Sequence, residues 1–443
     1  MRLEFVEGTS KKFWEAALDG TTLVVKWGRI GTAGQEKKYP FPNAREAREE
    51  HDALVQEKLK KGYQRTDAPK APPRNADLEA AMFDALDDAA PALVYADWLQ
   101  SNGNPWGELI SVQYALEKKP KDKALKKREA TLLKDLPLPH KDLGTVSWRR
   151  GCIDAIHFFN EQDWMDNGYD VLPLARGLFD LPHCGGLREL RTGVIRWDSN
   201  TEDVPNVLAE AAKRPFASRV KRLFLGDIPD NVDMDHHTIG DVRKVSKQFP
   251  GLTELKLHSG AASWSGPTNF EFGPLALPKL KTLIIETCGL TSKRAKQLTD
   301  STLPELESLE VWVGSPEHSA NAKLKDLAPI LEGKKFPKVT KLGLMNNEFS
   351  NELAAALVKS PIAARLESLS LSMGVLSESG VKALCAGASA FPKLKTLDVS
   401  DSYVVAADVK ALKKAFAKLE VIAKNPKEIY PDDPTGRYVS VHE

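Results

Sequence analysis

The stretch Leu277-Pro278-Lys279-Leu280-Lys281-Thr282-Leu283-Ile284-Ile285 returns near the end of the chain as Phe391-Pro392-Lys393-Leu394-Lys395-Thr396-Leu397-Asp398-Val399. Related stretches begin at Phe249, Leu303 and Phe336. A phrase that returns at intervals of a few tens of residues indicates stacked structural repeats, in which each copy contacts its neighbours. Repetition therefore decides the fold of most of this chain.

One leucine occupies the same place in every copy, weaker copies included, and successive copies are 33, 32, 28, 26, 33, 27 and 28 residues apart. Alternating apolar residues around it predict a short strand in each copy. Helices are expected after the strands, for example over 292–298, 351–359 and 378–386. The aligned leucines are Leu190, Leu223, Leu255, Leu283, Leu309, Leu342, Leu369 and Leu397.

The phrase, its period and the intervening helices resemble leucine-rich repeats of the ribonuclease-inhibitor-like class. The resemblance implies a curved α/β solenoid over residues 146–420, with a parallel sheet on its concave side. We expect one capping strand over 148–159 before the first repeat. Residues 421–443 are expected to form the C-terminal cap, with a last strand over 437–441.

Residues that alternate with the leucines should line the concave face of the sheet. Several of them are apolar, and adjacent exposed apolar side chains indicate a protein-binding stripe. The alternative is that they pack beneath the inserts at 261–275 or 315–321. The predicted binding residues are Phe224, Ile284, Trp312, Met345, Lys256 and Glu310, and His258, Glu286, Ser370 and Asp398 share their face.

A second informative stretch, Lys26-Trp27-Gly28-Arg29-Ile30-Gly31-Thr32, ends an apolar run near the N-terminus. Around it, residues 1–65 alternate like short strands, and Asp19-Gly20 is typical of a hairpin turn. Asn43, followed three residues later by Glu46, predicts a capped helix that runs to about Lys61. We expect a small antiparallel sheet with one helix across it.

The strands, the helix and the residues Trp27-Gly28-Arg29, Gly31 and Gly34-Gln35 resemble the WGR domain, as does the closing Lys61-Gly62-Tyr63. In the poly(ADP-ribose) polymerases, WGR domains engage broken DNA ends. The resemblance implies binding of duplex ends and phosphates, since arginine binds phosphate in a planar fork and a ring stacks on exposed nucleotides. Trp27 could instead belong to the core, and Arg29 could pair with an acidic neighbouring domain. The implied nucleic-acid-binding residues are Trp27, Gly28, Arg29, Lys26, Lys37 and Lys38.

Between these two regions, the three prolines of residues 66–75 predict a semi-rigid linker. Residues 76–145 are expected to be helical. Leu93 to Leu99, followed by Gly103-Asn104-Pro105, resembles the short bacterial repeat-companion domain that precedes leucine-rich repeats. No activity follows from that resemblance. The lysine-rich run over 118–127 is expected to be a solvated helix face, with a second phosphate patch as the alternative.

Composition narrows the functional classes. The net charge of +1 excludes a coat of positive charge over the whole chain, although residues 1–65 hold 13 Lys+Arg against 10 Asp+Glu. The four cysteines form no C-x-x-C pair, and no apolar run suits a membrane span, so we expect a cytoplasmic protein. Residues 230–237 form the only stretch that resembles metal ligands, and its spacing argues against a metal site.

The sequence contains no nucleotide-binding loop and no nucleophile elbow. We therefore expect a bacterial, multidomain α/β protein that is not an enzyme and needs no cofactor. The leading hypothesis is an adaptor, in which a nucleic-acid-binding module is coupled to a solenoid that binds an unidentified protein. The alternative is a scaffold for protein–protein interactions that binds no nucleic acid. Neither hypothesis involves a membrane.

Overall fold

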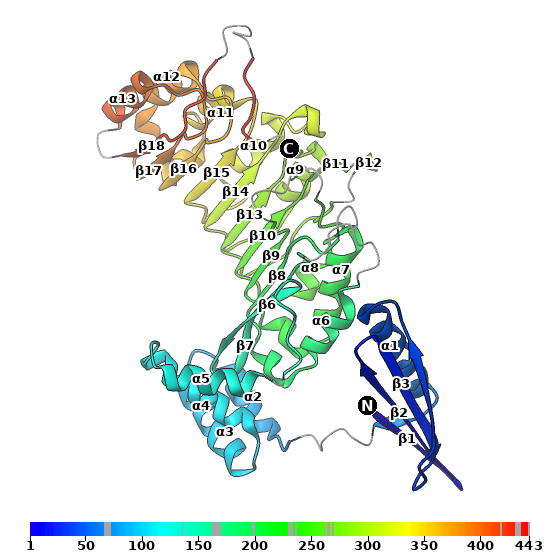
Figure 1. The fold of residues 1–443 in the computed structure, drawn as a ribbon. Helices are drawn as coiled ribbons and strands as arrows, with labels where there is room; N and C mark the ends of the chain where they lie inside the picture. Colours follow the sequence, from blue (N-terminus) through cyan, green and yellow to red (C-terminus); the bar gives the residue numbers. More distant parts are fainter. Residues whose placement is uncertain are drawn as a thin grey trace. The chain divides into compact units, whose positions relative to one another are not determined.

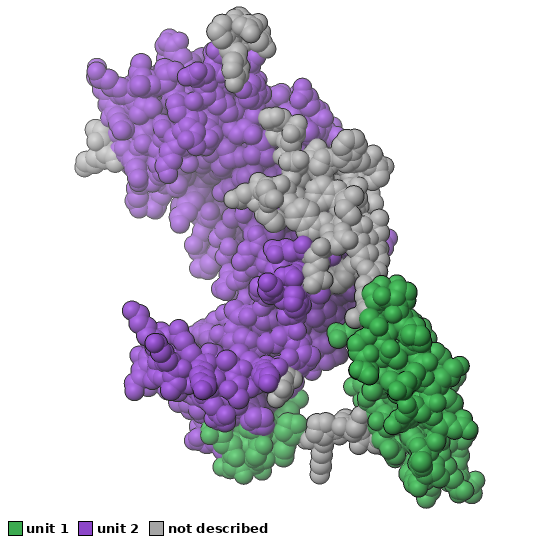
Figure 2. Space-filling view, in the orientation of Figure 1, with its two compact units in different colours: residues 1–75, 99–104 green, residues 76–98, 105–443 purple. Residues whose placement is uncertain are grey.

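A computed structural model describes most of the chain, and it separates into two compact units that are described here one at a time. The first unit holds residues 1–75 with 99–104, and the second holds 76–98 with 105–443 (Figure 2). The described residues are 1–65, 72–134, 136–161, 170–196, 200–228, 234, 237–260, 262–263, 266–267, 270–416, 419–429 and 436–441.

The first unit contains a five-stranded antiparallel sheet with the strand order β4-β3-β2-β1-β5. One helix, α1 (Ala44–Lys60), follows β4 and packs on the sheet (Figure 1). The predicted sheet and helix are confirmed, and the short β5 is an addition. The strands are β1 (Arg2–Glu7), β2 (Ser10–Asp19), β3 (Thr22–Arg29), β4 (Gln35–Pro40) and β5 (Gln64–Arg65).

The start of α1 follows from the predicted capping pair. The Glu46 amide donates to Asn43 Oδ1 at 2.9 Å, and Asn43 Nδ2 donates to Glu46 Oε1 at 2.8 Å. These bonds satisfy groups that the first helical turn leaves without partners. The sheet buries Leu3, Trp14, Ala16, Leu23 and Val25 together with Val55 of the helix, which makes a small separate core.

Four helices come next along the chain: α2 (Ala76–Asp84), α3 (Ala89–Ser101), α4 (Pro105–Lys118) and α5 (Lys123–Leu133). They belong to the second unit, except for residues 99–101 at the end of α3. The helix α4 is joined to the sheet through the backbone of Gly151. Trp106 Nε1 donates to the Gly151 carbonyl at 2.7 Å, and the Gly151 amide donates to Gln113 Oε1 at 2.6 Å. These buried bonds attach the helical segment to the first hairpin of the sheet.

That hairpin consists of β6 (Gly144–Arg149) and β7 (Cys152–Phe158), which pair antiparallel. The single capping strand expected over 148–159 is therefore wrong. The chain reverses at Arg150 and Gly151, which both have positive φ, at 51° and 77°. Two consecutive left-handed residues produce a tight reversal of the kind that joins hairpin strands.

From β7 to β18, consecutive strands of the main sheet lie side by side and parallel, in the order of the sequence (Figure 1). With β6 they form an eleven-stranded sheet, and a separate short hairpin joins β11 (Ala262–Ser263) to β12 (Gly266–Pro267). The remaining strands are β8 (Glu189–Thr192), β9 (Arg222–Leu225), β10 (Glu254–His258), β13 (Thr282–Glu286), β14 (Ser308–Trp312), β15 (Lys341–Met345), β16 (Ser368–Ser370), β17 (Thr396–Asp398) and β18 (Glu420–Ile422).

Helices occupy most of the connections between these strands, as parallel pairing requires. The helices expected over 292–298, 351–359 and 378–386 correspond to α9, α11 and α12, with ends that differ by at most two residues. The helices are α6 (Leu172–Phe179), α7 (Asn200–Ala211), α8 (Val245–Gln248), α9 (Ser292–Thr299), α10 (Leu324–Leu331), α11 (Ser350–Leu357), α12 (Glu378–Ala386) and α13 (Ala406–Ala415).

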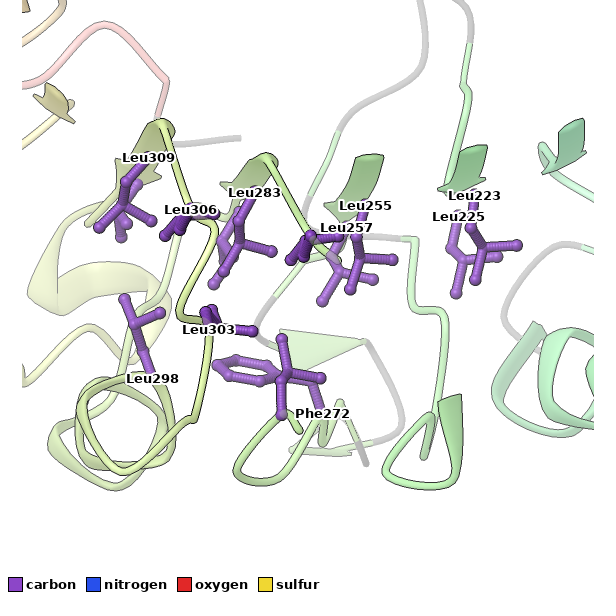
Figure 3. Packing of buried hydrophobic residues seen from close by; sticks show 14 of the residues in the cluster. Leu223, Leu225, Leu255, Leu257, Phe272, Leu283, Leu298, Leu303, Leu306 and Leu309 are labelled. Atoms are coloured by element: carbon purple, nitrogen blue, oxygen red, sulfur yellow. The ribbon is translucent and has the colours of Figure 1, made fainter. Parts of the chain in front are cut away.

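The eight aligned leucines form one continuous row across the sheet. Each is paired with the next, from Leu190 in β8 to Leu397 in β17, and none is more than 2% exposed. Figure 3 shows Leu223, Leu255, Leu283 and Leu309 extending from successive strands to the same side. The period predicted this alignment, because a residue at the same place in each repeat faces the same core.

The C-terminal segment differs from the expectation. The sheet ends at β18, and Arg437–Val441 is not a strand. Its backbone instead bonds to loops that follow earlier strands, as when Ser440 N donates to the Met373 carbonyl at 2.7 Å. The valines at 439 and 441 alternate as in a strand, but their partners are loop groups.

Among the described residues, no helix combines the length and the apolar character that crossing a membrane requires.

Candidate functional site

The register between β2 and β3 sets the geometry of the N-terminal site. Trp14 pairs with Trp27, and two residues further along Lys12 pairs with Arg29. Because alternate residues of a strand share a face, these four side chains lie on the face that carries the core. The two tryptophans pack with that core. Lys12 and Arg29 lie next to them, near the start of β2 and at the end of β3.

A groove of about 740 Å³ opens at this end of the sheet. It contains the predicted residues Trp27, Gly28 and Arg29, so the structure brings half of the predicted set together. In the described part of the chain, neither the Lys12 ammonium nor the Arg29 guanidinium forms an ion pair. The groove is lined by Thr9, Ser10, Lys11, Lys12, Phe13, Trp27, Gly28, Arg29 and Tyr63.

The end of the helix α1 adds a further cation and ring near the core tryptophans. Lys58 Nζ lies 5.9 Å from the ring centroid of Trp14 and 5.9 Å from that of Tyr63. Tyr63 also packs against Phe5, with ring centroids 5.4 Å apart. One wall of the groove is therefore aromatic, and positive charge lies beside it.

The predicted lysines outside this groove are engaged elsewhere. Lys26 Nζ lies 3.0 Å from Glu36, and Lys38 Nζ lies 3.9 Å from the same carboxylate. The hydrogen bond and charge of Glu36 raise the pKa of Lys26. By strand alternation both lysines belong to the face opposite Trp27. Lys37 shares the face of Trp27, but its ammonium lies over the Tyr39 ring at 4.8 Å.

Gly28 is required by packing. A Cβ at this position would approach the Cα of Gly34 to 2.7 Å, so a larger residue would collide with backbone. Gly34 has a φ of +69°, and its own Cβ would lie 2.6 Å from the Phe13 ring. The two glycines let the loop after β3 fold back onto the strand, which shapes the groove.

Lys11 and Lys12 were not among the predicted site residues, although the sequence carries a signal for Lys12. The predicted turn at Asp19-Gly20 pairs Asp19 with Thr22 in the structure. In an antiparallel pair each step back along one strand is a step forward along the other, so Lys12 falls opposite Arg29. Counting from the turn would have located this second cation beside the motif.

The second unit brings together the predicted row of its open sheet face, the face opposite the leucines. Phe224, Lys256, Ile284 and Glu310 are direct neighbours on β9, β10, β13 and β14. Lys256 Nζ lies 4.5 Å from the Phe224 ring centroid, and the Arg191 guanidinium carbon lies 5.2 Å from it on the other side. The ring is thus held between two cations and is half-buried.

Charged groups on this face are extensively paired. Glu286 lies 2.8 Å from Lys256 Nζ and 2.6 Å from His258 Nδ1. Burial would raise the pKa of Glu286, but these two partners lower it. Glu310 receives a bond from Trp312 Nε1 at 2.9 Å, and burial raises the pKa of its carboxyl.

Trp312 and Met345 pair one step further along β14 and β15. Trp312 packs against a small cluster formed by Met234 and Cys288, and Val441 of the C-terminal segment packs against the same cluster. The predicted stripe is therefore half-buried, and part of it is covered by the chain itself. Met234 and Val441 belong to neither of the inserts that we considered as a cover.

The metal-like stretch lies mostly outside the described residues, which include only Met234 and His237 of it. His237 is 3% exposed, and burial lowers its pKa to about 3. Across the residues that the structure describes, no three His, Cys, Asp or Glu side chains converge as a metal site would need.

The solved structures to which this chain is similar include two distant ones. A protein from Bacteroides fragilis shares 21% identity with a TM-score of 0.49, over 99% of this chain and 98% of that chain. A leucine-rich-repeat protein from Leptospira interrogans shares 13% identity with a TM-score of 0.22, over 56% of this chain and 74% of that chain. Both scores lie below 0.5.

Among curated proteins, the uncharacterized protein YfeS of Escherichia coli is 33% identical over 63 residues. The match covers 14% of this chain and spans about a quarter of the relative, 26% of its length. Comparison with family models assigns the N-terminal segment that carries the groove: residues 1–70 match the WGR domain.

Proposed function

We propose that this protein is a bacterial, cytoplasmic, non-enzymatic adaptor. Its WGR domain binds DNA ends or other phosphates, and its second unit binds a protein partner. The observation that carries the proposal is the groove in which Trp27, Arg29 and Lys12 lie together. It joins an aromatic ring to two cations, and that combination suits a nucleotide end.

The electrostatics of the groove support an anionic ligand. Lys12 and Arg29 lie directly opposite each other, and like charges at such a pair repel. An anion between them would relieve this repulsion, and the guanidinium can bind phosphate through two parallel bonds. Trp27 at the groove offers a ring for an exposed base or sugar.

For the second unit, we propose a leucine-rich-repeat solenoid of the ribonuclease-inhibitor-like class. Its support is the continuous row of buried leucines across parallel strands and the helices between them. The open face, with Phe224 held between Arg191 and Lys256, is the surface that we assign to a protein partner.

The test is binding of the full chain to fluorescent 5′-phosphorylated duplex, nicked duplex and single-stranded DNA over a range of salt concentrations. We expect the duplex end to bind best, with affinity that falls as salt rises. Arg29→Ala and Trp27→Ala should weaken binding at least tenfold. Binding that both variants leave unchanged, or no binding at low salt, would reject the nucleic-acid role.

The alternative is a protein-interaction scaffold without nucleic-acid binding, and the open sheet face favours it independently of the groove. Phe224 and Ile284 lie on adjacent positions around Lys256, so their substitution should remove partners captured from the native host. A chain that loses partners on Phe224→Ala, but never binds DNA, would establish the alternative. Retention of every partner in both variants would argue against this binding face.

A further inference from the structure

The C-terminal segment Arg437–Val441 lies across the ends of β15, β16 and β17. Ser440 N donates to the Met373 carbonyl at 2.7 Å. Asn346 holds the backbone of Val441 from both sides, since its Oδ1 accepts from Val441 N at 2.9 Å and its Nδ2 donates to Val441 O at 2.6 Å. A side-chain amide that bonds to both the N–H and the C=O of one residue makes a specific contact with an extended backbone.

The loops under this segment share a regular geometry. Asn346, Met373, Asp401 and Asn425 each lie four residues after the aligned apolar residue of their repeat, and all have positive φ, at 53°, 68°, 51° and 47°. The first three bond to the segment, because Ser440 Oγ also donates to the Asp401 carbonyl at 3.1 Å. The repeats therefore present their turn groups in a series that an extended chain can follow.

Side chains anchor the segment at both ends. Val439 is fully buried, whereas Tyr438 is 45% exposed. Lys427 Nζ donates to the Tyr438 carbonyl at 2.6 Å, and the Tyr438 amide donates to the Tyr403 hydroxyl at 3.1 Å. At the other end, Val441 packs against the same cluster as Trp312.

The attachment of the segment resembles that of a bound peptide more than that of a structural strand. It belongs to no sheet, and among the described residues of the segment only Val439 is fully buried. Short segments held by a few bonds to loops detach more easily than strands of a core. Release of the segment would uncover the part of the Met234 and Cys288 cluster against which Val441 packs.

We propose that the ends of β15–β17 form a docking surface for an extended peptide, and that the C-terminal segment is its resident ligand. A partner would displace it by presenting an extended segment with a β-branched apolar residue in the place of Val439 and free backbone groups for Asn346. The inference deepens the proposed function, on which it rests, because Trp312 and Met345 belong to the face that we assign to a protein partner.

Displacement is measured on the full chain with a fluorescein-labelled peptide of residues 436–443 as the probe. Val439→Asp places a carboxylate in the buried position and should release the resident segment. We expect the peptide to bind this variant at least tenfold more tightly than the wild-type chain, whose tethered segment competes at high effective concentration. A peptide that itself carries Val439→Asp should bind neither the wild-type chain nor the Val439→Asp chain.

Ile429→Asp is the matched control, because Ile429 is exposed and precedes the docked residues. It should behave like the wild-type chain. Equal peptide binding by all three chains, or no binding to a Val439→Asp chain with an unchanged circular dichroism spectrum, would overturn the proposal.

Hydrogen exchange on the wild-type chain tests the same idea without any substitution. The amides of Ser440 and Val441 should exchange at least tenfold faster than those of β16, which shows release without unfolding of the sheet. If the amides of Ser440 and Val441 exchanged at the same rate as those of β16, the segment would not be displaceable and the proposal would be rejected. Neither peptide binding nor hydrogen exchange requires a partner protein. Failure to capture a partner would therefore count against the proposed function, but not against displacement of the C-terminal segment.

Discussion

Lys12 lies directly opposite Arg29 across the antiparallel pair of β2 and β3, and both cations face the groove that contains Trp27. The relationship places a second cation beside Trp27-Gly28-Arg29. It also distinguishes this pair from Lys38, which lies on the other face of the sheet near Glu36.

If the groove binds DNA ends, Lys12→Ala should weaken binding about as much as Arg29→Ala. Each removes one phosphate contact, so the slope of the logarithm of affinity against the logarithm of salt concentration should fall by about one. Fluorescence anisotropy at several salt concentrations measures both quantities. Lys38→Ala removes the same charge from the opposite face and should change affinity less than twofold. Equal effects of Lys12→Ala and Lys38→Ala would show that only net charge matters.

Gly34 should be intolerant of a side chain. In Gly34→Ala the new Cβ would lie 2.6 Å from the Phe13 ring and 2.7 Å from the Trp27 carbonyl oxygen. We expect the free energy of local unfolding of β2 and β3 to fall by about 2–5 kcal/mol, the sum of about 1–3 kcal/mol for overpacking and about 1–2 kcal/mol for a side chain at this positive φ. Hydrogen exchange of these strands in the full chain measures the loss.

Gly31→Ala is the control for this substitution. Gly31 also has a positive φ, at 89°, but a Cβ there would meet no atom within 4 Å. Only the conformational cost of about 1–2 kcal/mol should remain. A Gly31 variant as unstable as the Gly34 variant would mean that backbone conformation, and not close packing, requires glycine in this loop.

Leu283 and Ile284 are neighbours in β13 with opposite roles. Leu283 is fully buried in the repeat core, whereas Ile284 lies half-buried on the open face. Leu283→Ala should lower the free energy of unfolding by about 2–5 kcal/mol because it leaves a cavity. Denaturant unfolding followed by circular dichroism measures this cost.

Ile284→Ala removes a side chain of similar size from the same strand. Its effect on stability should be less than half that of Leu283→Ala, and its main effect should be on partner capture. The reverse order of stabilities would contradict the assignment of faces in the sheet.

Acid should destabilise the second unit through His237. Burial lowers the pKa of His237 to about 3, whereas an unfolded histidine has a pKa near 6.5. Between these values the unfolded chain binds a proton that the folded chain does not bind, so stability falls as the pH drops from about 6.5 toward 3. The loss reaches at most about 3 kcal/mol at pH 4.

Thermal unfolding of the wild-type chain and His237→Gln between pH 7 and pH 4 tests this linkage. The variant should start less stable if the buried ring is well packed, but its stability should change less with pH. Identical pH slopes for the two chains would mean that other groups cause the acid sensitivity.

Local patterns in the sequence were sufficient for much of the fold. The spacing of Leu190 to Leu397 predicted one buried row, because residues at the same place in each repeat must face the same core. Asn43 and Glu46 predicted the start of α1, since their side chains satisfy the first turn of their own helix. Both signals depend on contacts that a repeat or a helix makes with its own neighbourhood.

Tertiary structure alone decided which charges remain available and what covers the open face. Lys26 and Lys38 resemble Arg29 in sequence, but pairing of β3 with β4 places Glu36 between them. Similarly, the two valines of the C-terminal segment are typical of a strand, yet Asn346 and Met373, far away in sequence, bind it as an extended ligand. Spacing in sequence therefore determined the elements and their buried faces, whereas the partners of the remaining polar groups depended on which strands and loops folding brings together.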